Sequence, residues 1–473
     1  MTNPAAIQTR LRADALAIFR ATLAECSISA AFQRALHCEA STLHRLRTTA
    51  SPATIPLIAV APTEIDLRRF PRILIIALGK AAVPMLDALM DQLPANIHST
   101  HDLRGVCAAP AFPAHPHPSI VCFAAGHPLP NADSFAAALA ALDLLRSATA
   151  ETLVFFLISG GGSALCELPL DPAISLEETR RFHQALVGCG APIAELNAIR
   201  QAFSAVKGGR LAAAAAHATQ YSLLVSDVPA DALDALASGP TLPSSHTPAA
   251  VAALLEHYRL LPQFPPAVRS FFERLTRRAT QPTPRAESQL DPARCFHDLL
   301  LSTDDLARSA TRHAQALGYT VTVDNHCDDW DYAQAAPYLL TRLQPLSATA
   351  ARACLISTGE VTVTLPVAPG SGGRNQQFAL EAARLLSTEA CATTVVLSAG
   401  TDGIDGISPA AGAIADAATF SRARAHELDP EAALDDCNAW PLFNALGDAV
   451  VTGPTGNNLR DLRLLLTAKE SAE

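Results

Sequence analysis

The sequence lacks any long apolar run, has few charged residues, and has more acids than bases. Its longest apolar runs, such as residues 73–78 and 153–158, are far too short to span a bilayer. The formal net charge of −10 disfavours a nucleic-acid partner, because that binding depends on Lys and Arg side chains that neutralise phosphates. Only 17% of the residues are charged and 49% are hydrophobic, which excludes a mainly disordered chain. We therefore expect a globular enzyme with small-molecule partners, no membrane and no nucleic acid; a homodimer is compatible with the sequence.

The cysteines lack the close spacing of a metal site or a disulfide framework. There are 11 of them, scattered, and none forms a CxxC pair. An odd number of scattered cysteines indicates reduced thiols. The N-terminus has Arg10, Arg12 and Asp14 within an amphipathic pattern and lacks the apolar stretch of a secretory signal. These features predict a cytoplasmic location.

Short apolar segments alternate with Ala- and Leu-rich helical patterns along most of the chain. Such alternation predicts βαβ units and an α/β fold with parallel strands that are buried on both faces. The strands we expect are 73–78, 153–158, 222–226, 296–301, 353–357 and 394–398.

The segment 243–292 interrupts this pattern with many prolines and two amphipathic pieces, 251–261 and 268–275. We therefore expect an N-terminal α/β domain at 1–245, a helical connection at 246–295 and a C-terminal α/β domain at 296–473. Each domain would contain a Rossmann-like or mixed sheet flanked by helices. Residues 7–46 have helical periodicity.

The most prominent candidate site is a glycine loop that follows a predicted strand. Ligands of open parallel sheets bind at the carboxyl ends of the strands. Three consecutive glycines let backbone N–H groups turn toward a ligand, and a following helix N-terminus favours an anion. The loop predicts phosphate or carboxylate binding, although a tight turn without a ligand is the alternative; its residues are Ser159, Gly160, Gly161, Gly162 and Ser163.

Two further segments place cations where an anion would be bound. Lys80 follows the first predicted strand, but the segment is not a Walker A loop, because the spaced glycine and the following Ser or Thr are absent. Asn197, Arg200, Ser204 and Lys207 fall three or four residues apart and would share one helical face. That face has two cations and no acid, which favours an anionic substrate over a solvated surface.

Acidic and amide side chains occupy the remaining candidate loops. Asp227 follows a predicted strand, Arg374 and Asn375 follow a glycine-rich turn, and Asp402 and Asp405 lie between glycines after another strand. Carboxylates in such loops can hold Mg²⁺ or accept a hydroxyl proton. The last candidate loop is a C-terminal turn rich in hydrogen-bonding groups, which contains Thr455 and Asn457.

Taken together, these motifs resemble the glycerate 2-kinase family, whose C-terminal half is the MOFRL domain. The resemblance extends from about Arg12 to Leu466 and depends on strings in one fixed order: GKAA (79–82), GHPLP (126–130), SGGGSAL (159–165), NAIRQAFSAVKGGR (197–210), SDV (226–228), ASGPT (237–241), GGRNQ (372–376), GTDGIDG (400–406), AAGA (410–413) and TGPTG (452–456). The chain departs from the family pattern at Ala202, Ala230, Thr358 and Gln377, where the family usually has His, Gly, Gly and Glu.

The resemblance implies phosphorylation of D-glycerate by ATP with Mg²⁺, giving 2-phosphoglycerate, in a cleft between two α/β domains. It implies Lys80, Arg374 and Asp402 as catalytic residues and a glycine loop, 160–162, that helps to bind anionic groups. The other candidate site residues named above would bind substrate or phosphate because of their own positions in the chain. Lys80 would offset charge on ATP, Arg374 would hold the phosphoryl group or the substrate carboxylate, and Asp402 would accept the hydroxyl proton. Asp227 and Asp402 are the candidate Mg²⁺ ligands.

The main alternative is an NAD(P)H-dependent hydroxypyruvate reductase. Such an enzyme requires a dinucleotide fingerprint, and the best candidate has Leu165 where the third glycine belongs. A binding protein without catalysis is a second alternative, but the Lys, Arg and Asp residues at strand ends favour an enzyme.

Overall fold

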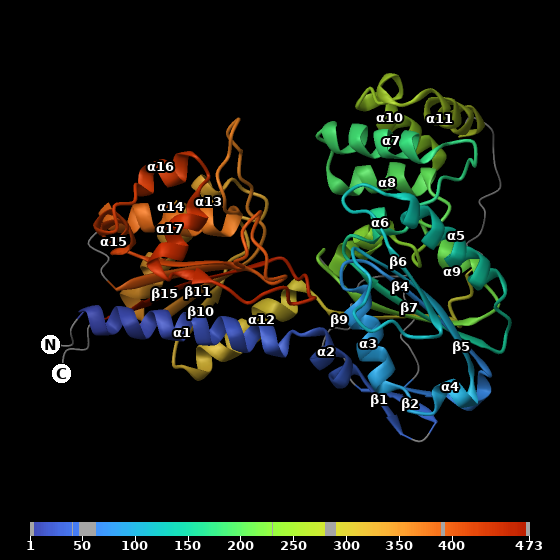
Figure 1. Ribbon diagram of the computed structural model, residues 1–473, viewed down its shortest axis with the longest axis horizontal. Helices are drawn as coiled ribbons and strands as arrows, with labels where there is room; N and C mark the ends of the chain where they lie inside the picture. The colour runs from blue at the N-terminus through green and yellow to red at the C-terminus, as the bar shows by residue number, and fades with distance from the viewer. Residues whose placement is uncertain are drawn as a thin grey trace. The chain divides into compact units, whose positions relative to one another are not determined.

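The computed structural model describes residues 4–39, 41–46, 63–228, 230–279, 290–388 and 393–469. The chain forms two compact units (Figure 1). One unit is Ala31–Leu301, and the other joins the N-terminal residues up to Ala30 to Ser302–Glu473. We call them the central unit and the terminal unit.

The central unit is built on a six-stranded parallel sheet. Its strand order is β6-β5-β4-β7-β8-β9, with every neighbouring pair parallel. The central strands are continuous apolar runs whose side chains are buried on both faces, as parallel sheets require. The strands are β4 (Arg72–Leu78), β5 (Asp102–Ala109), β6 (Ile120–Ala124), β7 (Thr152–Ser159), β8 (Thr219–Val225) and β9 (Cys295–Leu301).

Helices pack against this sheet. α5 contacts α6 and α9, and the core beneath these helices includes Ile76 of β4 together with Phe156 and Ile158 of β7. α3 packs against β4, β5 and β7. The helices of this part of the unit are α3 (Ala82–Gln92), α4 (Ile97–Thr100), α5 (Ala132–Arg146), α6 (Gly162–Leu165), α9 (Arg210–Ala214) and the 3-10 helices η1 (Leu67–Arg69) and η2 (Ala230–Ser238). The boundary between the two units falls within α2 (Ile28–Ala35).

A second core lies in a group of helices in the same unit. Phe182, Phe203, Phe264 and Phe272 stack there and are fully or almost fully buried. Phe182 and Phe203 lie in the first part of the segment 176–279, and Phe264 and Phe272 lie in its last part. The packing of these four rings therefore makes the segment part of the central unit. The helices are α7 (Leu176–Gly188), α8 (Ile193–Phe203), α10 (Pro248–His257), η3 (Leu261–Gln263) and α11 (Pro266–Ala279).

A small antiparallel sheet completes the central unit. It consists of β1 (Leu36–Glu39), β2 (Thr42–Arg45) and β3 (Glu64–Asp66). Arg45 binds both carboxylate oxygens of Asp298 in β9, with Nε and Nη2 distances of 2.5 and 2.6 Å. Tyr221 of β8 donates to the same carboxylate. This buried cluster attaches the small sheet to the large one.

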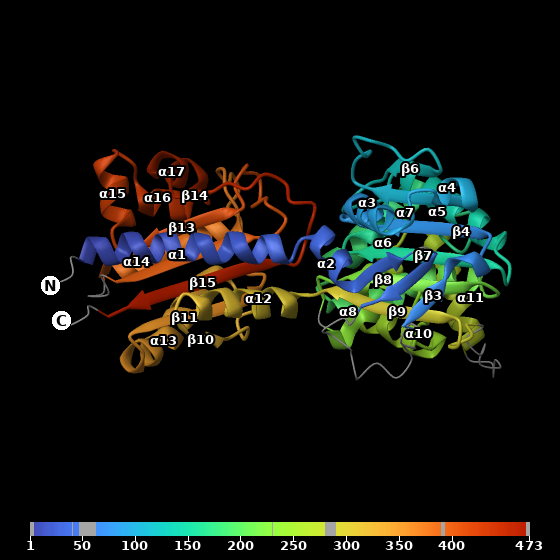
Figure 2. The ribbon, with the colours of Figure 1, turned by 90° about the horizontal axis from the view of Figure 1, so that it is seen from below.

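The terminal unit has a mixed six-stranded sheet. Its order is β10-β11-β15-β12-β13-β14, and only β10 and β11 are parallel. The strands are β10 (Thr320–Val323), β11 (Arg352–Gly359), β12 (Thr394–Gly400), β13 (Gly412–Asp416), β14 (Ala449–Val450) and β15 (Asp461–Ala468). α13 and α14 pack on one core of this unit, while α1 and α12 pack against β12, β15 and β11 (Figure 2). The helices are α1 (Pro4–Glu25), α12 (Thr303–Ala316), α13 (Tyr332–Thr349), α14 (Arg374–Thr388), α15 (Thr419–Ala425), α16 (Pro430–Asp435) and α17 (Ala439–Leu446).

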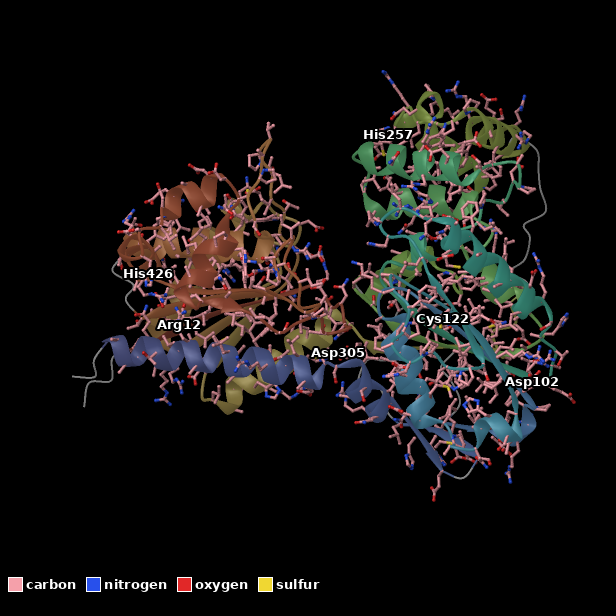
Figure 3. All side chains as sticks on the ribbon, in the orientation of Figure 1. Arg12, Asp102, Cys122, His257, Asp305 and His426 are labelled. Atoms are coloured by element: carbon pink, nitrogen blue, oxygen red, sulfur yellow. The ribbon has the colours of Figure 1, made fainter. Side chains whose placement is uncertain are left out.

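The first helix of the chain belongs to the terminal unit. Arg12 of α1 (Figure 3) forms ion pairs with Asp416 and Asp448, whose side chains are only 4% exposed. Glu25, at the end of α1, accepts a hydrogen bond from Ser309 (2.7 Å) and contacts His313 Nε2 (3.0 Å), both in α12. Charged contacts across about 300 to 400 residues of chain therefore hold α1 in place.

The six predicted strands and the α/β class are confirmed, but the division of the chain differs from the expected one. Residues 296–301, expected to begin the second domain, lie in β9, which pairs in parallel with β8 as the sixth strand of the first sheet. The expected connection at 246–295 contributes α10 and α11 to the aromatic core. Within 7–46, the helical pattern ends at Ala35, and β1 and β2 follow.

Among the described helices, none alone is both long and apolar enough to cross a membrane. The bent pair Ala5–Glu25 and Ile28–Ala35 meets that length and composition only when its two helices are joined.

Candidate functional site

The central sheet has a topological switch point between β4 and β7. From β4 the chain moves outward through β5 and β6, and from β7 it moves in the other direction through β8 and β9. The loops that leave β4 and β7 therefore diverge, and such a point, at the carboxyl ends of the strands, is where open parallel sheets bind their ligands. Lys80 and the glycine loop of Ser159–Ser163 both lie at this position.

The two loops are hydrogen-bonded to each other. Lys80 N–H donates to Gly160 O at 2.8 Å, and Ala81 N–H donates to the Ser159 hydroxyl at 3.0 Å. Gly161 has φ +82°, a left-handed conformation that L side chains rarely adopt. Ser159 therefore fixes the start of α3, and the glycine loop holds the backbone of Lys80.

Three side chains from three strand-end loops pack against the glycines. A Cβ at Gly161 would lie 3.0 Å from Lys80 Cγ and 3.3 Å from His127 Nε2. A Cβ at Gly160 would lie 2.1 Å from Asp227 Oδ2. A Cβ at either glycine would displace these side chains. The loop thus brings a cation, an imidazole and a carboxylate to one place, which suits a phosphate chain and its metal ion.

The helix that follows the glycine loop is shorter than the sequence predicted. The helix expected to follow it is α6, a single turn of four residues. So short a helix adds little dipole, since the macrodipole sums over aligned peptide units. The remaining support for an anion comes from Lys80 and the switch-point position.

A chain of hydroxyl and amide groups leads away from the glycine loop. The Ser163 and Ser238 hydroxyls lie 2.7 Å apart, and Ser238 donates to Asn197 Oδ1 at 3.0 Å. Arg200 Nη1 donates to the same amide oxygen at 3.2 Å, while its buried Nε has no partner among the described residues. Burial lowers the pKa of Arg200. Arg200 thus retains a donor for an anion near the loop.

Lys207 does not share a helical face with Asn197 and Arg200. α8 ends at Phe203, and Lys207 lies beyond it, 1% exposed. Its Nζ is 2.6 Å from Glu167 Oε2, which also contacts His183 Nε2 at 2.9 Å. The expected absence of an acidic partner is therefore wrong for Lys207, because the acid is supplied by a residue 40 positions earlier. Lys207 neutralises a buried carboxylate.

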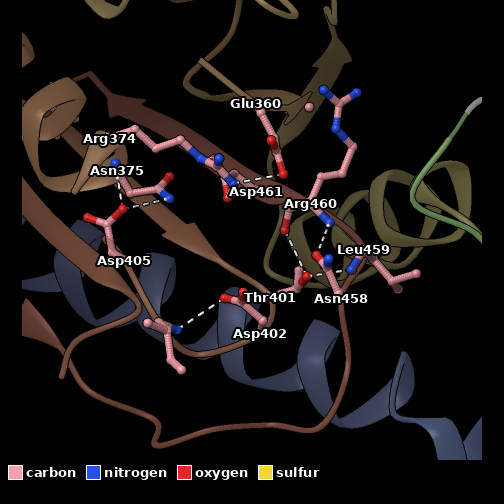
Figure 4. A network of polar contacts seen from close by, with 12 residues as sticks. Glu360, Arg374, Asn375, Thr401, Asp402, Asp405, Asn458, Leu459, Arg460 and Asp461 are labelled. Carbon is pink, nitrogen blue, oxygen red and sulfur yellow. Dashed lines mark hydrogen bonds and ion pairs between the residues drawn. The ribbon is translucent and has the colours of Figure 1, made fainter. Parts of the chain in front are cut away.

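In the terminal unit, Arg374 is held by two carboxylates (Figure 4). Its Nε and Nη2 donate to the two oxygens of Asp461 at 2.6 and 3.1 Å, and Nη2 is 2.8 Å from Glu360 Oε1. Asp461 is 1% exposed and the Arg374 side chain is 37% exposed. Burial raises the pKa of Glu360, and the charge of Arg374 opposes that shift. The guanidinium is fixed in direction while part of it faces solvent.

Asp405 caps the helix that begins at Arg374. Its two oxygens accept from the backbone N–H groups of Asn375 (3.0 Å) and Gln376 (2.9 Å), and from both side-chain amides. A Cβ at Gly373 would lie 2.3 Å from Asp405 Oδ1, so the glycine permits this approach. Burial raises the pKa of Asp405 to about 6, against the effect of these N–H donors. Asp405 and Asn375 therefore shape the start of α14 and face each other.

Asp402 lies in the neighbouring loop and is partly exposed. Its Oδ1 accepts from Ile404 N–H at 3.1 Å, and its backbone oxygen accepts from Thr455 N–H at 3.0 Å. The Thr455 hydroxyl donates to Thr401 O at 2.6 Å (Figure 4 shows Thr401 and Asp402). Asn457 donates its side-chain amide to Cys26 O at 2.6 Å. Thr455 and Asn457 therefore support the loop of Asp402 and the end of α1.

The acidic residues do not form a multidentate metal centre in the part of the chain that is described. No group of three or more His, Cys, Asp or Glu side chains there could hold a metal ion. Mg²⁺ bound with a nucleotide commonly takes one or two carboxylates and completes its shell with phosphate oxygens and water. Asp227, packed on Gly160, fits that smaller role.

Four residues of these sites were not predicted as site residues from the sequence: His127, Ser238, Glu360 and Asp461. Asp461 begins β15 and Glu360 follows the end of β11, so antiparallel pairing, with Asp461 opposite Gly359, puts both at the same edge of the sheet. That pairing spans about 100 residues of chain, and no local pattern reveals it. His127 and Ser238 lie within the motifs GHPLP and ASGPT, so those motifs contained a usable signal.

Comparisons with known proteins give matches in both halves of the chain. Residues 14–273 match a family model described as a domain of unknown function (DUF4147), and residues 353–461 match the MOFRL family. The chain is 32% identical over 404 residues to a glycerate 2-kinase of Pyrococcus horikoshii, in a match that covers 84% of this chain and 88% of that protein. A relative from Agrobacterium vitis, provisionally named a hydroxypyruvate reductase, is 33% identical over 84% of this chain and 99% of its own length. A solved glycerate kinase of Thermotoga maritima superposes with a TM-score of 0.77 at 28% identity, over 97% of this chain and 100% of that one.

Proposed function

The chain belongs to the glycerate 2-kinase family, and from this premise we propose that it transfers the γ-phosphoryl group of ATP to the 2-hydroxyl of D-glycerate. The observation that supports this most directly is the convergence of Lys80 and Asp227 on the glycine loop at the switch point of the central sheet. A cation and a carboxylate there match the needs of a phosphate chain that is accompanied by a divalent ion.

The central unit would bind the phosphate chain. Lys80 offsets negative charge on the phosphates, and Asp227 is the first candidate to hold Mg²⁺, with Asp402 of the terminal unit as the second. When bound, Mg²⁺ would neutralise charge on phosphate oxygens. Arg200, Asn197 and Ser163 would hold an anionic group of the substrates, since their hydrogen bonds to Ser238 connect them with the loop.

The terminal unit would supply the residues that act on the reacting groups. Arg374 holds the transferring phosphoryl group or the glycerate carboxylate through the part of its guanidinium that faces solvent. Asp402 orients the hydroxyl and accepts its proton, while the hydroxyl oxygen bonds to phosphorus and the bond from phosphorus to ADP breaks. A cation on the transferring group contributes about 10³ to 10⁵ in rate, and a general base about 10² to 10⁴.

Reduction of hydroxypyruvate is the second candidate, because one relative has that name. Leu165 stands where a dinucleotide fingerprint needs its third glycine, and it is fully buried in the core of the unit. This favours the kinase. A cytoplasmic location, expected from the cysteines, stays part of the proposal.

The proposal is tested by ³¹P NMR of the purified protein with Mg-ATP and D-glycerate. A glycerate-dependent signal of 2-phosphoglycerate is the expected result. A 3-phosphoglycerate signal would reject the assignment of the 2-hydroxyl. Absence of any phosphorylated product, together with NADH oxidation by hydroxypyruvate, would favour the reductase.

A further inference from the structure

His127 is held in a rigid turn beside the glycine loop. The turn follows β6 and ends at Asn131, which caps α5 and donates its side-chain amide to Ala124 O at 3.0 Å. Gly126 N–H donates to the Ser134 hydroxyl at 3.1 Å. A Cβ at Gly126 would lie 2.3 Å from Leu129 O, so only glycine allows the turn to close this tightly. Both ends of the turn are therefore fixed, and His127 lies between them.

The imidazole of His127 shares one face of Gly161 with the stem of Lys80. His127 Cδ2 and Nε2 would lie 3.2 and 3.3 Å from a Cβ on Gly161, and Lys80 Cγ would lie 3.0 Å from it. The carboxylate of Asp227 packs against the adjoining glycine, Gly160. An oxyanion bound at this loop would thus contact groups from the loops after β4, β6 and β7.

The ring nitrogens of His127 have no hydrogen-bond partner among the described residues. His127 is exposed at the surface of the unit, yet partial desolvation beside the loop and then the charge of Lys80 lower the pKa of its imidazole, which favours the neutral ring. A neutral imidazole has one N–H donor and one acceptor. It can add a hydrogen bond to an anion beside Lys80 without a second positive charge that would repel the ammonium group.

We propose that His127 is a binding residue of this site, with its Nε2 donating a hydrogen bond to an oxygen of the nucleotide's phosphate chain at the glycine loop. This inference rests on the proposed function. Neither the spacing of its motif nor the expected catalytic set assigned a role to His127.

The first test follows the imidazole directly by ¹⁵N NMR of the histidine side chains, with Mg-ADP as the probe. The His127 signals, assigned from their loss in H127Q, should shift on addition of Mg-ADP, and its pKa should rise because bound phosphate opposes the effect of Lys80. Asp227, which packs on Gly160, is present in both states and therefore does not account for a shift. A shift caused by D-glycerate and not by Mg-ADP would overturn the proposal, because the anion would then be a carboxylate.

The second test separates binding from chemistry. In H127A, KM for ATP should rise about 3- to 10-fold, as expected for one hydrogen bond, while kcat changes less than about twofold. H127Q should restore part of the affinity, because its amide N–H reaches the position of Nε2, and H127N should not. H246Q, which changes an exposed histidine in the same unit, is the matched control and should have no effect.

An unchanged KM for ATP with a loss of about 100-fold in kcat would overturn the proposal and place His127 on the reacting hydroxyl. Equal KM values for H127Q and H127N would overturn the assignment to Nε2. The NMR titration requires no turnover. If the wild-type protein failed to phosphorylate glycerate, the proposed function would fall, while a shift of His127 with Mg-ADP would still establish phosphate binding at the loop.

Discussion

At the scale of single residues, Arg374 depends on its carboxylates for its direction. D461N should lower kcat about 10²-fold, because the amide offers an N–H₂ group where Arg374 needs an acceptor, and a small displacement of a catalytic group has that effect. E360Q is the control and should have a smaller effect, since the Glu360 side chain is 33% exposed and makes one contact with Arg374, whereas Asp461 is 1% exposed and binds with both oxygens. Steady-state kinetics measures both. Full kcat in D461N would mean that the direction of Arg374 is unimportant for the reaction.

Lys207 should affect stability and not substrate binding. K207M leaves Glu167 buried without its cation, which should lower the free energy of unfolding by about 3–5 kcal/mol. The KM values should stay within about twofold, because Lys207 is buried by its own unit. The double variant E167Q/K207M should lose less than the two single variants together. Urea unfolding and kinetics test this; a tenfold higher KM with unchanged stability would restore the role expected from the sequence.

Asp405 should make the terminal unit less stable as the pH rises. Its pKa is raised from 3.8 to about 6 by burial, so between these values the folded state retains a proton that the unfolded state has lost. The free energy of unfolding should therefore fall, by up to about 3 kcal/mol, as the pH rises through that window. D405N should remove this part of the slope. Urea unfolding at pH values from about 4 to 7 measures it, and equal slopes in the two proteins would contradict the raised pKa.

At the scale of elements, two glycines with the same backbone conformation have different surroundings. Gly161 and Gly190 have φ +82° and +74°, but only Gly161 has side chains against its missing Cβ. Both G161A and G190A should lose about 1–2 kcal/mol of stability, the cost of a left-handed alanine. G161A should also raise KM for ATP, because its methyl group meets Lys80 and His127. Thermal unfolding and kinetics compare them; equal activity in both variants would place the nucleotide elsewhere.

The elements that could be predicted are those specified by their own residues. The apolar strands β4, β7 and β8 and the glycine loop between two of them were found from local pattern. β15 was missed because Asp461 and Arg463 interrupt its apolar run, although both side chains are buried in the structure. Lys207 was misjudged for a related reason: its partner Glu167 is close in space and far in sequence. Contacts between residues that are distant in the sequence determine both β15 and the role of Lys207, and a local sequence pattern does not reveal such contacts.

At the scale of the whole molecule, the chain crosses between its two units twice, near Ala30 and near Leu301. The sequence predicted two α/β units but not these crossings. The contacts that assign α1 to the terminal unit join Arg12 to Asp416 and Asp448, and no feature of α1 alone reveals them. Likewise, the proline-rich stretch before β9 looked like a connection, because the aromatic residues that α11 packs against lie in α7 and α8.

Both tryptophans of the chain, Trp330 and Trp440, lie in the terminal unit, so their fluorescence reports the unfolding of that unit alone. R12M removes one positive charge from the buried carboxylates of Asp416 and Asp448. It should lower the free energy of unfolding of the terminal unit, measured by fluorescence in urea, by about 3 kcal/mol. F272A opens a cavity in the aromatic core of the central unit, at about 3–5 kcal/mol, and should leave that transition in place.

Circular dichroism, which follows both units, should detect the loss in either variant. The contrast between the two probes arises because each unit has its own hydrophobic core, and a unit with its own core can unfold by itself. If F272A moved the tryptophan transition as far as R12M does, the two units would unfold as one cooperative body. The cores of the central and terminal units would then be coupled in stability, and the positions at which the chain crosses between them would be the first place to seek that coupling.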